Sequence, residues 1–382
     1  MTAPAPATRP QLMPGGFANA YPADIRPLTS LRFLAAMWVL LFFFGERLGL
    51  DWREASGFVA KGYLGVDLFF ILSGFILAHV YGPQLIAGSF NYGSFLWARI
   101  ARIYPVHLMT LIILVGLAIV AGAVGLEVNA AFDFGTLWAQ ALLVHGWGLV
   151  PGGGWNHPSW SISAEWFAYL LFPLLFATAS LFSRRVWWGV AGSAGVFVGL
   201  WIVAPHFPFS NGADLTAFTA FGAIRIVPSF VMGVALWRLG QSVTLPAQAA
   251  WIVAGISAVA VVVASEMRLA DPLIWLALVT MIFGLAEASK SGTGGLLALP
   301  AALWLGEASY ALYMIHMPVD LVWFQALGRF LSAEQLQAGA PVFVSGAIIF
   351  SVLAAGLMYT LIETPARGWL RARDPFKGTA RE

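Results

Sequence analysis

Long apolar stretches separated by short polar segments follow one another along the whole chain. Most are close to the ~20 residues that a helix needs to cross the hydrocarbon core of a bilayer. The pattern predicts an all-α, polytopic transmembrane bundle with no room for a soluble domain of normal size. The ten predicted spans are 28–45, 63–81, 104–124, 164–182, 186–204, 220–239, 248–264, 271–288, 302–324 and 341–362.

A further apolar stretch, 136–150, is short and runs into the glycine-rich loop 151–154. If it does not cross and the N-terminus is cytoplasmic, 14 of the 20 Lys and Arg residues lie on the inner side, as the positive-inside rule requires. If it crosses, every later span is inverted and the basic C-terminus faces outward. We therefore expect 136–150 to be re-entrant or interfacial and both termini to be cytoplasmic. The inner basic residues are then Arg9, Arg26, Arg32, Arg99, Arg102, Arg184, Arg185, Arg238, Lys290, Arg367, Arg371, Arg373, Lys377 and Arg381.

The two ends of the chain differ from the apolar region between them. Residues 1–25 are rich in Pro and Ala and lack the apolar segment of a signal peptide, so we expect a cytosolic tail. Residues 26–370 are expected to form the membrane domain, and 371–382 a basic cytosolic tail.

The amino-acid composition excludes several classes of protein and of catalytic site. With 60% hydrophobic and 10% charged residues, the chain is unlike a soluble domain. It has no cysteine, which excludes disulfides, thiolate nucleophiles and zinc-thiolate sites. Its six histidines show no metal-binding spacing, so no metal is expected, and nothing points to nucleic acid.

Ionisable residues occur within or at the edges of the predicted spans. A charge at the centre of a membrane helix costs roughly 2.5–3.5 kcal/mol on insertion scales, so such residues are candidates for function. Each one alone is equally well explained by an arginine that reaches the headgroups or by a polar pair that joins two helices. The set comprises Arg32, Asp67, His79, His107, Glu165, Arg225, His316 and Glu363.

Local patterns favour function for two groups. The segment 160–165 opens a span with hydroxyls and the carboxylate of Glu165, just after His157. Tyr313 and His316 are spaced i, i+3 on one helix face. Under the ten-span topology these groups lie in the outer half with Asp67 and Arg225. We expect His157, Glu165 and His316 to lie near one cavity that opens outward.

The inner edge carries Arg32, and it also carries Arg99 and Arg102 ahead of Tyr104. A basic rim beside a helix start suits a phosphate-bearing cytosolic ligand. An equally simple explanation is that Arg99 and Arg102 only set the topology.

Six segments, in this order and spacing, resemble the acyltransferase-3 family of bacterial integral-membrane O-acyltransferases, which acetylate exopolysaccharides, O-antigens and related glycans. They are 32–36, 65–75, 99–105, 160–165, 309–318 and 363–367. The resemblance covers residues 26 to 370. It implies an acyl-CoA donor, usually acetyl-CoA, that is reached from the cytoplasm. It also implies a polysaccharide or lipid-linked glycan acceptor and a place among the lipids of the bacterial inner membrane. A homodimer is a further expectation.

One position departs from the family pattern. The first span of the family has an arginine, ten residues and then a histidine that is taken as the catalytic base. In this chain ten residues separate Arg32 from Phe43, so Phe43 stands at the position of the histidine. Phenylalanine accepts no proton, whereas a positioned base contributes roughly 10²–10⁴-fold. The chain is therefore expected to be an impaired enzyme. Phe43 is either an engineered exchange or a natural variant with another base or no activity. The intact motifs favour the first.

In an active form we expect a base at position 43 to be oriented by Glu165 or Asp67. The oxyanion would be stabilised by Arg32, Arg225, Tyr313 or His316. The expected donor site comprises Arg99, Arg102, Tyr104, Arg225 and Ser73, and the expected acceptor site comprises His157, Trp160 and Ser163. Two other functions stay open, since intramembrane charges also mark transport pathways. These are a transporter or flippase for a glycan or lipid-linked intermediate, and a scaffold in an export complex.

Overall fold

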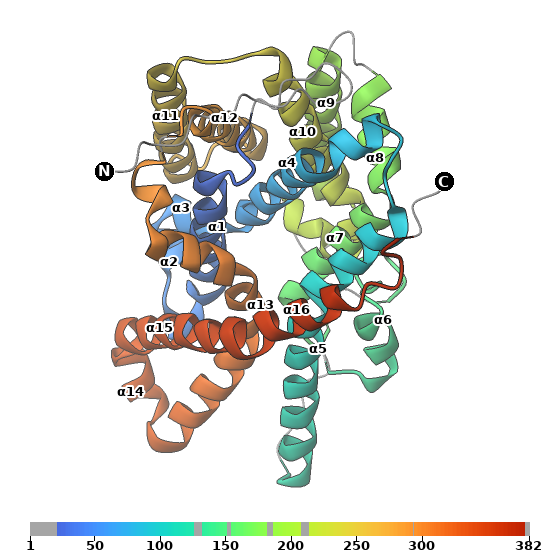
Figure 1. Ribbon diagram of the computed structural model, residues 1–382. Coiled ribbons are helices and arrows are strands. Elements are labelled where there is room, and N and C mark those ends of the chain that lie inside the picture. Colours follow the sequence, from blue (N-terminus) through green and yellow to red (C-terminus); the bar gives the residue numbers. More distant parts are fainter. Residues whose placement is uncertain are drawn as a thin grey trace, which may run out of the picture.

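The computed structural model describes residues 21–125, 132–150, 154–181, 186–207, 214–292 and 294–378. Within these ranges the regular structure is helical and contains no strand. The longer helices are α1 (Arg26–Phe44), α4 (Gly65–Ile86), α5 (Tyr92–Ala123), α7 (Trp160–Leu170), α8 (Phe172–Leu181), α9 (Val186–Val203), α10 (Gly222–Ser242), α11 (Ala247–Glu266), α12 (Asp271–Ser289), α13 (Pro300–Phe330), α15 (Ala340–Met358) and α16 (Thr364–Ala372) (Figure 1).

Short helical turns join these helices. Four are α-helical: α2 (Trp52–Ala55), α3 (Gly57–Ala60), α6 (Leu137–Ala141) and α14 (Ala333–Ala338). The 3₁₀ turns are Arg47–Gly49, Gly62–Leu64, Phe134–Thr136, His157–Ser159, Ala204–His206, Leu215–Phe221 and Gly295–Ala298. A π-helical turn, Tyr359–Glu363, joins α15 to α16.

The described residues contain eight helices long and apolar enough to cross a membrane, or nine with the bent pair of α7 and α8. The eight cover every predicted span except 164–182 and 302–324. The second of these lies in α13, which is 31 residues long but carries Glu307, Asp320 and Arg329. The protein is a multi-pass, all-α membrane protein, as the sequence predicts.

The span predicted at 164–182 is wrong as a single straight helix. It is broken at Leu171, where α7 and α8 meet at 73°. Pro173 explains the break, because it has no N–H to donate to the carbonyl four residues earlier and its ring crowds that carbonyl. α7 therefore enters the bundle as a short arm of 11 residues.

The stretch 136–150 does not form a helix that could cross a membrane, because α6 has only 5 residues. The chain then turns back against α7. Ser163 Oγ donates to the carbonyl of Leu143 at 2.7 Å and accepts from the N–H of Gly146 at 3.0 Å. Ser163 thus holds this loop in place. Residues 151–153 of the glycine-rich loop lie outside the described part of the chain.

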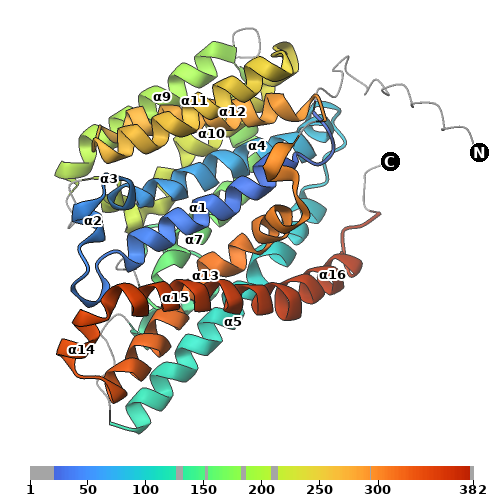
Figure 2. The same ribbon diagram turned by 90° about the vertical axis from the view of Figure 1, so that its left-hand side faces the viewer.

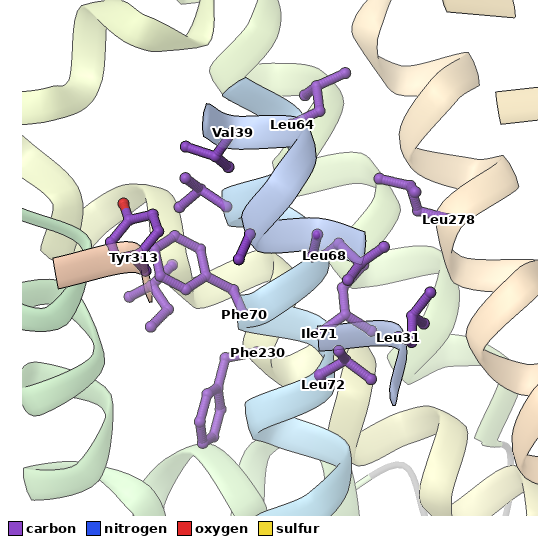
Figure 3. Close-up of a cluster of buried hydrophobic side chains, with 14 of the residues drawn as sticks. Leu31, Val39, Leu64, Leu68, Phe70, Ile71, Leu72, Phe230, Leu278 and Tyr313 are labelled. Atoms are coloured by element: carbon purple, nitrogen blue, oxygen red, sulfur yellow. The ribbon is translucent and has the colours of Figure 1, made fainter. Parts of the chain in front are cut away.

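Helix α4 lies in the core between α1, α10 and α12, surrounded by buried aliphatic and aromatic side chains (Figure 3). Two glycines let α4 and α10 approach closely. A Cβ added at Gly74 would lie 2.0 Å from the carbonyl oxygen of Phe230, and one at Gly233 would lie 2.0 Å from that of Ile71. Small residues at a crossing let membrane helices gain van der Waals contact.

The two ends of the described chain lie at one end of the bundle (Figure 2). Near the start of α1, Ser30 Oγ donates to the carbonyl of Leu297 at 2.6 Å, and Arg367 of α16 lies 3.8 Å from Glu307 of α13. We call this the basic end. At the opposite end, Arg47 pairs with Asp320 at 2.5 Å. Helices α1 and α13 therefore run in the same direction.

The predicted cytosolic tail begins to pack before residue 26. Tyr21 and Ile25 are buried, and the Tyr21 hydroxyl donates to Glu287 at 2.7 Å. Residues 1–20 lie outside the described part of the chain.

Candidate active site

A cavity of about 130 Å³ lies inside the bundle between α1, α4, α5, α7 and α13. It brings together six of the predicted site residues, which come from all five helices. Its polar lining is Arg32, Ser73, Arg99, Arg102, Ser161, Glu165, Tyr169, Tyr310 and Tyr313. The remaining lining is apolar: Val66, Phe69, Phe70, Leu72, Ile76, Leu77 and Ile162.

Arg99 and Arg102 are inside a helix, not ahead of one as predicted. α5 begins at Tyr92, after Asn91 has capped it by accepting a hydrogen bond from the N–H of Ser94 at 3.0 Å. The two arginines therefore lie two to three turns into α5. They line the cavity with their side chains from within α5 and do not stand before its first residue.

Arg102 is held by a buried acidic partner. It forms an ion pair with Glu363, whose side chain is fully buried, and its guanidinium lies 5.7 Å from the Tyr310 ring centre. Glu363 is the last residue of the π-helical turn, and such turns often occur at functional sites. A π-helical turn has more residues per turn than an α-helix, and this changes the direction of the side chains around it. Glu363 is buried in the bundle, where it pairs with Arg102.

Arg32 and Arg99 have no carboxylate partner among the described residues. Arg99 Nη2 donates to the Tyr81 hydroxyl at 3.3 Å. For Arg32, the described ranges show no hydrogen bond or ion pair, and Glu165 acts on it only through charge at longer range. The cavity thus has more guanidinium than carboxylate charge and suits an anionic ligand.

Glu165 and Tyr313 are both fixed by hydroxyl groups. Ser73 donates to Glu165 Oε1, so this half-buried carboxylate has a hydrogen-bond partner. The Tyr313 hydroxyl donates to the carbonyl of Pro158 at 3.0 Å and accepts from Ser161 at 2.8 Å. These contacts hold α7 against α4 and α13.

Glu165, His157 and His316 were predicted to lie near one outward-opening cavity, but Glu165 alone of the three lines the cavity. Glu165 lines the cavity together with Arg32, Arg99 and Arg102, whereas the two histidines do not. Ser73 of α4, which donates to Glu165, lines the same cavity and holds the carboxylate among the arginines.

Phe43 and the two histidines form a second group towards the opposite end. The Phe43 ring centre lies 5.2 Å from that of His316 and 5.7 Å from that of His157. Eleven residues make three helical turns, so Arg32 and Phe43 lie on one face of α1, about 16 Å apart along its axis. Tyr313 joins the two groups, since it lines the cavity and its ring centre lies 6.0 Å from His316.

Four other predicted site residues lie away from both groups. Asp67 and Arg225 neutralise each other in a buried ion pair of 2.6 Å. Trp160 is buried under the Arg225 guanidinium, 5.2 Å from its ring centre, and is no platform for a sugar. The Tyr104 hydroxyl donates to the carbonyl of Leu142 at 3.4 Å and does not reach the cavity.

A larger cavity of about 560 Å³ lies between α5 and α13, near the opposite end. Its lining is aliphatic and aromatic apart from Gln325 and Arg329, with no histidine or carboxylate. It therefore lacks the groups for proton transfer, and the smaller cavity is the candidate site.

Three polar residues of the cavity, Ser161, Tyr169 and Tyr310, were not predicted as site residues although the sequence carries a signal for them. Ser161, Glu165 and Tyr169 follow at spacings of four, which places all three on one face of α7. Tyr310 precedes Tyr313 by three residues and shares its face of α13. Placing these faces of α7 and α13 against each other would have predicted both tyrosines as site residues. No pattern in the sequence around Glu363 or Arg102 indicates that the two form an ion pair.

Comparison with known proteins decides the family. The family model described as an acyltransferase domain, Acyl_transf_3, matches residues 25–360. The chain belongs to this family. Its relatives include the acyltransferase MdmB of Streptomyces mycarofaciens, with 29% identity over 91% of this chain and 93% of the relative.

Two further relatives have more specific names. The exopolysaccharide production protein ExoZ of Rhizobium meliloti is 24% identical over 84% of this chain and 94% of the relative. The O-acetyltransferase OatA of Staphylococcus aureus is 23% identical over 91% of this chain but only 58% of its own length. No solved structure matches the chain.

Proposed function

We propose that this membrane O-acyltransferase moves an acetyl group from coenzyme A to a hydroxyl of an exported or cell-surface polysaccharide or of a lipid-linked glycan. The observation that carries the proposal is the cavity, in which Arg32 has no partner and lies with Arg99 and Arg102 around a single carboxylate. The names of two relatives, an O-acetyltransferase and an exopolysaccharide production protein, support the acetyl group and the polysaccharide.

The donor would lie with its phosphates over the basic end. Arg367 and Arg371 of α16 add positive charge near Arg99 there, and guanidinium groups bind phosphate with two parallel hydrogen bonds. A cavity of about 130 Å³ admits only the thioester end of so large a donor. Its apolar walls would keep water from the thioester. The basic end would then be the cytoplasmic one, with the protein in the bacterial inner membrane.

The acceptor would approach from the opposite end. His157 and Phe43 are half-buried and so reach the surface there, while Arg32 lies three turns deeper on the same face of α1. Donor and acceptor would thus meet along one helix face. Phe43 itself supplies no base.

Equilibrium binding of labelled acetyl-CoA to the purified full chain in detergent tests the donor site. Arg32→Gln should weaken binding about tenfold or more, since a hydrogen bond to a charged group contributes ~1.5–3 kcal/mol. Arg329→Gln removes the same charge at the opposite end and is the control, with unchanged affinity expected. Folded protein without saturable binding would contradict the transferase and favour the transporter.

A further inference from the structure

We propose that His316 is the proton acceptor in this chain and takes the place of the imidazole that is missing at position 43. The proposal rests on the proposed function, because it assigns the base for transfer from the same donor. His316 lies on α13, one turn beyond Tyr313, and its side chain is 2% exposed.

The position of His316 is the first argument. Its ring centre lies 5.2 Å from that of Phe43, where the family places its base, and 6.0 Å from that of Tyr313, which lines the cavity. An imidazole on α13 therefore lies beside the space that an imidazole on α1 would occupy. His316 thus lies between Phe43 and Tyr313, and Tyr313 connects it to the cavity.

The free ring nitrogens of His316 are the second argument. Neither Nδ1 nor Nε2 has a well-formed hydrogen bond in the described part of the chain, and only the carbonyls of Leu312 and Tyr313 in the preceding turn approach the ring. A buried imidazole with no fixed partner keeps a lone pair for a substrate proton. Such an unpaired polar group costs stability and so invites a functional explanation.

The other histidines near the site are less suitable. His107 Nε2 is 2.8 Å from the carbonyl of Gln140, and His145 Nε2 is 3.0 Å from Ser159 Oγ, so both hold the loop before α7. His157 also borders Phe43, at 5.7 Å, but it lies in the 3₁₀ turn before α7 and outside the helix that carries Tyr313. His157 is therefore the matched comparison.

The proposed step balances without any further reagent. The acceptor hydroxyl loses its proton to a ring nitrogen of His316 while its oxygen forms a bond to the acyl carbon of the coenzyme A thioester. The carbon–sulfur bond breaks and its electron pair leaves with sulfur. The imidazolium then returns the proton to the thiolate, so the products are the ester and the free coenzyme A thiol. With water as acceptor, the same step hydrolyses the thioester.

The test measures release of the free thiol from acetyl-CoA by the full chain in detergent, first with water and then with membrane glycan as acceptor. The chain has no cysteine, so a thiol reagent reports coenzyme A alone. His316→Gln should lower the rate about 10²-fold with acetyl-CoA affinity retained, and His157→Gln should lower it less than about tenfold. Adding Phe43→His to His316→Gln should restore most of the rate, which a misfolded variant would not allow.

The possible results distinguish the role of His316 from the proposed transferase function. A rate that survives His316→Gln, or that falls only with His157→Gln, overturns the role of His316 and leaves the transferase standing. If only proteins with Phe43→His release thiol, the chain has no substitute base and His316 is rejected. If folded protein with either residue at 43 binds no acetyl-CoA, the proposed function itself fails.

Discussion

The ring centre of Phe43 lies 5.2 Å from that of His316, so an apolar side chain on α1 covers an unpaired imidazole on α13. The Phe43 ring also lies against His157. Three rings from three separate segments of the chain thus meet at the position where the family resemblance leads us to expect a base. From this contact we predict how substitutions of Phe43 change the reaction rate.

Phe43→His should raise thiol release from acetyl-CoA at least about tenfold, because it adds a base at the family position beside His316. The measurement is the initial rate of both forms at saturating acetyl-CoA. Phe43→Leu is the control, since it changes the side chain without adding a base and should not raise the rate to the same extent. Equal rates for the His and Phe forms would show that position 43 carries no proton transfer.

Arg102→Gln should lower the free energy of unfolding by roughly 3 kcal/mol, because it leaves Glu363 buried without its partner. The double variant Arg102→Gln with Glu363→Gln should recover most of that loss. Arg367→Gln is the control, because its 3.9 Å contact with Glu363 is more exposed and should contribute less than about 1 kcal/mol. Thermal unfolding followed by tryptophan fluorescence gives the comparison. Single and double variants of equal stability would mean that the pair does not hold Arg102.

Gly233→Ala should destabilise the bundle by about 1–3 kcal/mol, because the added Cβ would lie 2.0 Å from the carbonyl oxygen of Ile71 and force α4 and α10 apart. Gly192→Ala on α9 is the matched control, since no atom lies within 4 Å of its added Cβ. In a helix that exchange should be neutral or stabilise slightly. The same unfolding assay decides, and equal shifts for both variants would contradict the close crossing.

Membrane-impermeant maleimide should label Glu334→Cys in intact cells with a permeabilised outer envelope, and Ser89→Cys only after the inner face is exposed. Both side chains are exposed, on α14 and on the loop before α5, and the chain has no cysteine of its own. The expectation follows from the basic residues that the ten-span topology places inside. The reverse labelling would invert the protein in the membrane and place the donor site outside.

The sequence alone determined the class of protein and the neighbours along each helix. Apolar stretches of membrane-spanning length specify the spans, because helix formation in a bilayer is decided locally by the need to satisfy every backbone hydrogen bond. Helical periodicity likewise sets Arg32 and Phe43 on one face of α1, and Tyr313 with His316 on one face of α13.

Only the tertiary structure decided which faces meet. The spans are apolar all round, so periodicity does not mark the side that packs inward, and helix contact in a membrane depends on close steric fit. Fit at Gly74 and Gly233 sets the crossing of α4 and α10. In the same way, no local pattern couples Arg102 to Glu363 or Asp67 to Arg225. The contact of Phe43 with His316 also depends on how α1 packs on α13, since the two rings belong to different helices.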